Sequence, residues 1–97
     1  MSRIDKINEE VRREVAEVIR SLKDSRIPMM TSVVAVNVTK DLRYAKVYVS
    51  VMGDEATKKK AIEGLKSAAG FVRREMGRRV DLRYTPEFIF ELDRSIE

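Results

Sequence analysis

Two valine-rich segments separated by four residues constrain the fold more than any other feature of this sequence. Residues 44–52, YAKVYVSVM, alternate strictly, with Ala45, Val47 and Val49 on one face and larger or polar side chains on the other. This period of two predicts a strand with one buried face. Residues 31–39, TSVVAVNVT, are rich in β-branched side chains and predict a second strand. The short KDLR between them predicts an antiparallel hairpin, whose buried face other elements must cover.

The strand predicted at residues 31–39 is apolar on both faces, which predicts a protected and central position in the sheet. Because side chains alternate along a strand, we expect Val34, Val36 and Val38 to share one face. Met29 and Met30 precede the strand, and we interpret them as core filling. An exposed methionine pair would instead form an adaptable contact surface.

Apolar residues on either side of the hairpin follow a helical period. At the N-terminus they recur at steps of three and four as far as about Lys23, which predicts one amphipathic helix. After the hairpin a second helical pattern continues to about Gly77, a plausible C-cap. Gly70 interrupts it, and glycine costs about 1 kcal/mol relative to alanine in a helix interior. We interpret Gly70 as a joint between two helices, with Phe71 and Val72 packing the second helix onto the core.

A third strand is predicted at residues 87–93, EFIFELD, where alternation returns. The expected order is therefore helix, strand, strand, helix, helix, strand, in an α+β domain with helices on one face of a small sheet. The length fits a single domain over residues 1–97. The sequence has no apolar run long enough to cross a membrane, and its charged N-terminal segment does not resemble a signal peptide. We therefore expect a cytoplasmic protein.

The composition argues against an enzyme. The sequence contains no cysteine and no histidine, which removes thiol chemistry, the commonest general base and most zinc ligands. It contains no glycine-rich phosphate loop, and its three consecutive lysines, Lys58 to Lys60, would fan out around a helix. We expect no catalytic residue, no metal, no cofactor and no small-molecule substrate.

Positive charge is concentrated in one part of the chain. The net charge is +4, and residues 56–85 contain nine basic residues against three acidic ones. Lys66, Gly70, Arg73, Arg74 and Arg78 are spaced to share one helix face, which suits contacts with nucleic-acid phosphates. A solvated helix face is the alternative. A glycine in that face allows a ligand to approach the backbone closely, or it allows packing against a neighbouring element.

Three stretches together resemble the ribosome-binding factor A family: DLRYAKVYVSV, SAAGFVRRE and LRYTPEFIFELDRSI. The resemblance covers almost the whole chain, with the stretches in the same order. It implies a KH-like domain of type II, with the order α-β-β-α-α-β. In ordinary KH domains a GxxG loop clamps the nucleic-acid backbone. The family replaces that loop with a helix–kink–helix, here at Ala68-Ala69-Gly70.

The resemblance also implies a function. It indicates a ribosome assembly factor that binds 16S rRNA in the immature 30S subunit, assists late maturation and rRNA processing, and is associated with growth in the cold. We expect a monomer that acts without a membrane. The RNA-binding residues implied are those of the helix–kink–helix and the basic residues near it, namely Lys66, Ala68, Ala69, Gly70, Arg73, Arg74, Arg78, Arg79 and Arg83.

Three other functions are compatible with the sequence. A general KH-type regulator that binds single-stranded RNA is disfavoured by the missing GxxG loop. A protein-interaction module would use the Met29–Met30 loop or an exposed strand edge. A small phosphate-handling enzyme fits the composition least.

Overall fold

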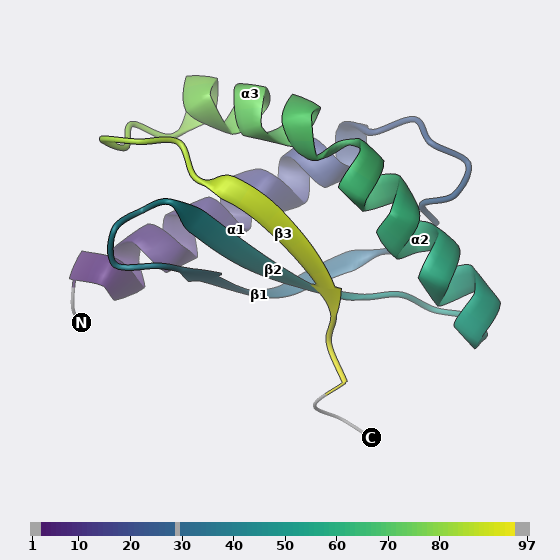
Figure 1. Cartoon of the computed structure of the whole chain (residues 1–97). Helices are drawn as coiled ribbons and strands as arrows, with labels where there is room; N and C mark the ends of the chain where they lie inside the picture. Colours follow the sequence, from purple (N-terminus) through teal and green to yellow (C-terminus); the bar gives the residue numbers. More distant parts are fainter. Residues whose placement is uncertain (1–2, 29, 95–97) are drawn as a thin grey trace.

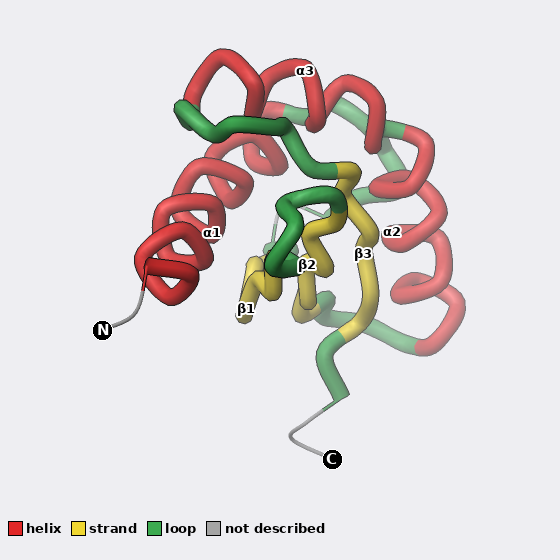
Figure 2. Tube along the Cα trace, turned by 60° about the vertical axis from the view of Figure 1, so that its left-hand side comes forward, coloured by secondary structure: helices red, strands yellow, loops and turns green. Residues whose placement is uncertain are grey.

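Three helices cover one face of a three-stranded sheet in the computed structural model, which describes residues 3–28 and 30–94 (Figure 1). Figure 2 shows the helices arching over the sheet, with α3 between α1 and α2. The predicted element order and the α+β class are confirmed. The elements are α1 (Arg3–Ser21), β1 (Ser32–Val38), β2 (Tyr44–Ser50), α2 (Glu55–Ser67), α3 (Ala69–Arg79) and β3 (Glu87–Leu92).

The central strand of the sheet is β2. It pairs antiparallel with β1, through the predicted hairpin, and parallel with β3. A parallel pair needs a crossover connection, and α2 and α3 supply it. On the covered face, buried apolar side chains pair across all three strands, in the rows Val36–Val47–Phe90 and Val38–Ala45–Phe88.

The prediction that the first strand is central was wrong, because β1 lies at the edge of the sheet. Its register with β2 shifts between Val33 and Ala35. This bulge leaves Val34 44% exposed, while Val33 packs against the core. Met30 is 72% exposed, so its interpretation as core filling was also wrong. Met29 lies outside the described residues.

The first helix packs its apolar stripe against β1 and α3. Val11, Val15 and Val18 form the centre of that stripe and are fully buried. A polar contact adds to this packing, since the Asn8 side-chain oxygen accepts a hydrogen bond from the Val38 amide at 2.9 Å. The contact joins the helix to the edge strand, where outward backbone amides have no neighbouring strand to pair with.

The loop between α1 and β1 passes close to α2 at Gly64. A Cβ atom at Gly64 would lie 3.0 Å from Ile27 and 3.2 Å from Arg26, so the glycine permits this close approach. Within the loop, the Asp24 carboxylate accepts hydrogen bonds from the Arg26 side chain and amide, at 2.7 and 2.9 Å. These hydrogen bonds lower the pKa of Asp24 to about 2. The loop is thereby held in a defined shape against the helix.

One prediction about the second helical region was wrong. Phe71 keeps 41% of its surface exposed and does not pin α3 to the core. The buried side chains of α3 are Val72 and Met76. Phe71 directly precedes Val72, so it is rotated by about 100° around the helix axis from that buried position. The helix also continues past Gly77, with Val80 rather than Gly77 at its C-terminal end.

Truncating Leu65 and Phe71 should therefore have unequal effects on stability. Leu65 is fully buried at the end of α2, so Leu65→Ala should lower the free energy of unfolding by about 2–5 kcal/mol. Phe71→Ala should cost less than about 1 kcal/mol, because the ring already contacts water. Denaturant unfolding of both variants provides the measurement. Equal losses would contradict the position of Phe71 outside the core.

Candidate nucleic-acid interface

A single residue, Ala68, joins α2 to α3. Its φ of −90° and ψ of 0° depart from helical values, while its amide still donates to the carbonyls of Gly64 and Leu65 at 3.1 Å each. The next helix begins as the Val72 amide donates to the Ala68 carbonyl at 2.9 Å. This change of direction lets α2 follow β3 while α3 reaches both β3 and α1 (Figure 1). The predicted helix–kink–helix is confirmed, but its joint lies at Ala68 and not at Gly70.

Gly70 lies in the first turn of α3, with its backbone exposed. A Cβ atom there would meet nothing within 4 Å, so the glycine does not pack against a neighbouring element. Ala68 is the N-cap of α3 and makes no side-chain hydrogen bond to its first amides. The helix therefore begins without a capping side chain, one residue after the carboxyl end of α2, whose partial negative charge offsets the positive end of α3. Ala68 and Ala69 are half-buried against the core.

Four exposed cations lie on α2 and α3, from the joint to the last turn of α3: Lys66, Arg73, Arg74 and Arg78, which we call the basic face. Lys66 and Arg74 have no hydrogen bond or ion pair with any residue in the described ranges 3–28 and 30–94. Lys66 stands at the margin, where it also lines a groove between α2 and β3. Arg78 is 81% exposed and lies 3.5 Å from Glu75, one turn away. Exposed ion pairs of this kind are weak, so Arg78 can leave Glu75 and bind an external anion at little cost, as Lys66 and Arg74 can without leaving a partner.

Besides Arg78, two predicted site residues have partners within the protein. Arg79 contacts the carboxylates of Glu14 and Glu17 on α1 at 3.3 and 3.0 Å, and so connects α3 to α1. The Arg73 Nε donates to the Thr85 carbonyl at 3.2 Å, which holds the segment before β3. Arg79 thus has a structural role that was not apparent in the sequence, because its partners belong to a helix distant along the chain.

Arg83 lies outside the basic face. It lines a hollow together with Arg3 and Ile7 of α1 and Leu42 of the turn before β2. Its guanidinium lies over the ring of Tyr84, 5.6 Å from the centroid, which is a cation–π arrangement. The structure therefore places Arg83 in a hollow beside the basic face, and not on that face with the residues with which it was grouped.

A repeated tetrapeptide marks this second surface, and the sequence predictions did not include it. Asp-Leu-Arg-Tyr occurs at residues 41–44 and again at residues 81–84. The structure brings the two copies together at one end of the sheet (Figure 1). Tyr44 and Tyr84 are 43% and 56% exposed. Exposed aromatic rings among cations are typical of surfaces that bind single-stranded RNA. The repeat is visible in the sequence, whereas the proximity of its copies is not.

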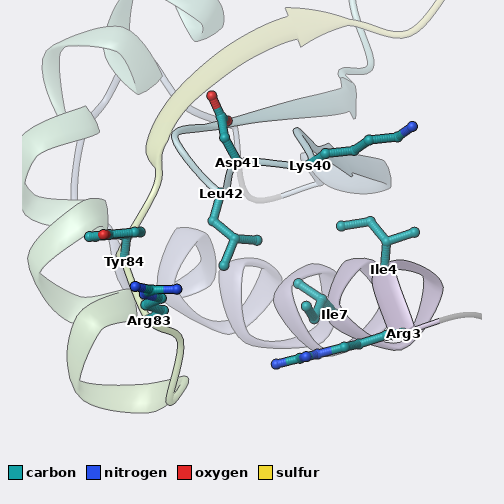
Figure 3. Close-up of a pocket in the computed structure, with 8 residues that line it drawn as sticks. All are labelled: Arg3, Ile4, Ile7, Lys40, Asp41, Leu42, Arg83 and Tyr84. Atoms are coloured by element: carbon teal, nitrogen blue, oxygen red, sulfur yellow. The ribbon is translucent and has the colours of Figure 1, made fainter.

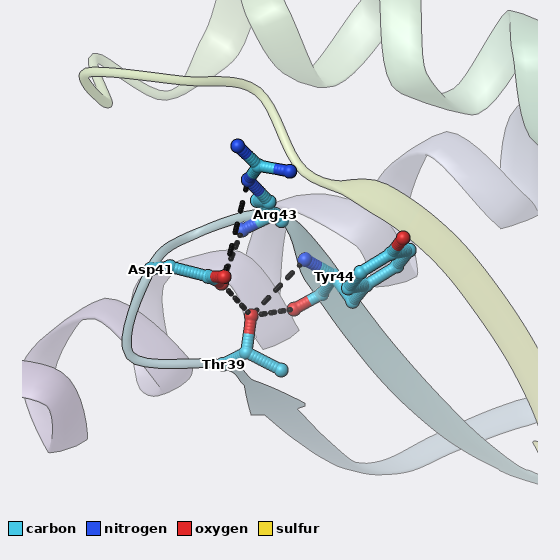
Figure 4. A network of polar contacts seen from close by, with 4 residues as sticks. All are labelled: Thr39, Asp41, Arg43 and Tyr44. Atoms are coloured by element: carbon cyan, nitrogen blue, oxygen red, sulfur yellow. Dashed lines mark hydrogen bonds and ion pairs between the residues drawn. The ribbon is translucent and has the colours of Figure 1, made fainter.

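Polar contacts fix the first copy of the repeat in the turn between β1 and β2 (Figure 4). Asp41 accepts hydrogen bonds from the Thr39 hydroxyl at 2.7 Å and the Arg43 amide at 3.0 Å. The hydroxyl contact contributes most to lowering the pKa of Asp41, so the carboxylate is ionised and already well solvated by donors. The Tyr44 amide in turn donates to the hydroxyl oxygen of Thr39 at 3.1 Å. Leu42 has a φ of 62°, which a branched side chain rarely adopts.

Two other kinds of feature are absent from residues 3–28 and 30–94. No group of three or more acidic side chains is placed to hold a metal ion. No helix combines the length and the apolar character needed to cross a membrane.

A methyl group at position 70 should distinguish a ligand contact from an empty surface. Because the added carbon has no neighbour within 4 Å, Gly70→Ala should fold normally and raise the stability by up to about 1 kcal/mol. If an RNA backbone approaches Gly70 closely, the same methyl group should weaken RNA binding. Thermal unfolding and RNA-binding titrations of one protein preparation measure both effects. A stabilised variant with unchanged RNA affinity would show that no ligand approaches Gly70.

One family model matches nearly the whole chain. The model described as Ribosome-binding factor A matches residues 3–97. A protein from Acetivibrio thermocellus, named Ribosome-binding factor A, is 64% identical over 98 residues. The match covers 100% of this chain and 80% of that relative.

Solved structures share the fold. The crystal structure of ribosome-binding factor A from Thermus thermophilus has a TM-score of 0.86 and 28% identity, covering 95% of this chain and 97% of that one. A homology model of the Thermus thermophilus factor, fitted into the electron cryo-microscopy map of a 30S–RbfA complex, has a TM-score of 0.76. It is 29% identical and covers 92% of this chain and 93% of that one. The predicted fold class is therefore confirmed.

Proposed function

Because this chain belongs to the ribosome-binding factor A family, we propose that it binds the small ribosomal subunit through the basic face of α2 and α3. The Thermus thermophilus structure fitted into a 30S complex supports this assignment of the partner. The observation that carries the choice of surface is the helix joint. There the uncapped start of α3 lies at the bare backbone of Gly70, and Lys66 and Arg74 have no partner within the described residues.

The ligand on this face is the phosphate backbone of 16S rRNA. A phosphate can approach the backbone at Gly70 closely, because no side chain covers it there. Lys66 and Arg74 neutralise neighbouring phosphates and release their counterions, so binding weakens as salt rises. Contacts of this kind position a protein on RNA without reading its sequence. They suit a partner that is recognised by its folded shape.

The role we propose is assistance in the late maturation of the 30S subunit in the cytoplasm, including processing of 16S rRNA. We further propose that this role supports growth in the cold. The protein acts by binding and not by catalysis, which the absence of histidine and cysteine from the sequence supports. A binding protein can still direct RNA folding, because it shifts the population toward the conformation that it binds more tightly.

Charge reversal on the basic face should abolish association with small subunits. Arg74 and Arg78 are exposed, so Arg74→Glu combined with Arg78→Glu should leave the fold intact. We leave Arg73 unchanged because it holds the Thr85 carbonyl. The matched control, Arg13→Glu with Arg20→Glu, alters the net charge equally on the exposed face of α1. We expect at least a tenfold loss of affinity for immature 30S particles in the first variant, and much less in the control.

Co-sedimentation with purified immature particles measures this difference. Normal co-sedimentation of the Arg74 and Arg78 variant, or an equal loss in the control, would contradict the proposed surface. Sequence-selective binding to short single-stranded RNA, without association with particles, would instead favour a general KH-type RNA regulator.

A further inference from the structure

Two adjoining hollows lie where the two Asp-Leu-Arg-Tyr segments meet. The first has a volume of about 400 Å³ and lies between the start of α1, the turn before β2 and Arg83 (Figure 3). The second has a volume of about 540 Å³ and includes Arg73 of the basic face. Leu42 and Tyr84 line both hollows, so they form the boundary between them. The first hollow is thus connected along the surface to the basic face.

The first hollow combines apolar side chains with guanidinium groups. Ile4, Ile7 and Leu42 are half-buried and line it together, and Figure 3 shows Leu42 pointing toward α1. Arg3 and Arg83 also line it, and neither has an ion-pair partner among the residues that the structure describes. Apolar contact area beside two cations matches a ligand with a flat, weakly polar part and an anionic part.

Tyr84 supplies the aromatic surface of this hollow. It is 56% exposed, more than is usual for a ring that contributes to a core. The Arg83 guanidinium lies over one face of the ring, 5.6 Å from its centroid, and the residue remains 56% exposed. A base that stacks on such a ring gains affinity without sequence-specific hydrogen bonds.

One carboxylate, that of Asp41, also lines the hollow. Its charge is offset by hydrogen bonds from the Thr39 hydroxyl and the Arg43 amide, and by the Arg43 guanidinium at 3.9 Å. Asp41 thus opposes an anionic ligand less than an isolated carboxylate would. Lys40 adds a further cation to the same lining.

We propose that this hollow, the tyrosine pocket (Arg3, Ile4, Ile7, Leu42, Arg83 and Tyr84), accepts one unpaired nucleotide of an RNA strand. The base stacks on Tyr84 above the apolar side chains, and Arg3 and Arg83 bind the adjoining phosphate. The proposal rests on the proposed function in that its ligand is RNA. Because Arg73 lines the neighbouring hollow, one strand can extend from α3 to the tyrosine pocket.

Nuclear magnetic resonance of the whole chain, with ¹³C-labelled isoleucine and leucine methyl groups, tests the proposal. The probes are hexa-adenylate, adenosine monophosphate and a hexaglutamate peptide, which carries negative charge without a base. A stacked base should shift the methyl resonances of Ile4, Ile7 and Leu42 through its ring current. We expect these shifts with hexa-adenylate, much weaker binding of the monophosphate, and no shifts with the peptide.

Substitutions then separate stacking from charge. Tyr84→Ala should weaken hexa-adenylate binding at the tyrosine pocket about tenfold, whereas Tyr84→Phe keeps the ring and should retain affinity within about twofold. Arg83→Ala should weaken binding more than Arg20→Ala, which removes the same charge from the exposed end of α1. Both tyrosine variants should fold, since the ring is mostly exposed.

Three results would overturn the proposal. Equal methyl shifts with hexaglutamate would indicate a peptide or a charge site. Monophosphate binding as tight as that of hexa-adenylate would exclude an RNA strand as the source of the nucleotide. Shifts confined to α2 and α3 would restrict RNA to the basic face. Because this titration uses no ribosomal particle, its outcome is independent of the co-sedimentation test of the proposed function.

Discussion

The buried face of the sheet is the constraint on which the other features depend. The rows that cross it, such as Val36–Val47–Phe90, would be exposed to water without the helices. Burial of apolar area at about 25 cal/mol per Å² favours helices that follow this face closely. One straight helix between β2 and β3 would not follow both β3 and α1. The break at Ala68 resolves this, since it directs α2 along β3 and α3 toward α1.

The same break creates the surface that we assign to RNA. Just after the break, Gly70 leaves the exposed backbone of α3 uncovered by any side chain. The nearby cations then divide into two groups. Arg79 and Arg73 are held by α1 and Thr85, and they stabilise the position of α3. Lys66 and Arg74 have no such contact within the described residues and remain available to a ligand.

The sequence predicted the fold well because its elements have strong local patterns. Alternation in residues 44–52 and 87–93 and the helical period of α1 are properties of the chain itself. The errors came from features that no local pattern records. A bulge in β1 turned Val34 outward, and pairing with two strands made β2 central. Glycine indicated a joint near Gly70, but packing on the sheet and on α1 placed it at Ala68.

The candidate site was predictable in part, because the spacing of residues along a helix is also a local pattern. Spacing along a helix identified the exposed cations Arg74 and Arg78. It could not show that Arg79 meets carboxylates of α1, or that Arg83 lies beside the start of that helix. These contacts join segments far apart in the sequence and depend on how the helices cross the sheet. The surroundings of Tyr84 arise in the same way, from the meeting of the two repeat segments.

The central claim is that the surface around the helix joint faces rRNA in the immature small subunit. Site-specific photo-crosslinking tests it most directly, with benzoylphenylalanine in place of Phe71 beside the joint or of Val34 on β1. The two side chains are similarly exposed, at 41% and 44%. The account predicts crosslinks to 16S rRNA from position 71 and few from position 34. Crosslinks to rRNA from position 34 with none from position 71 would contradict it.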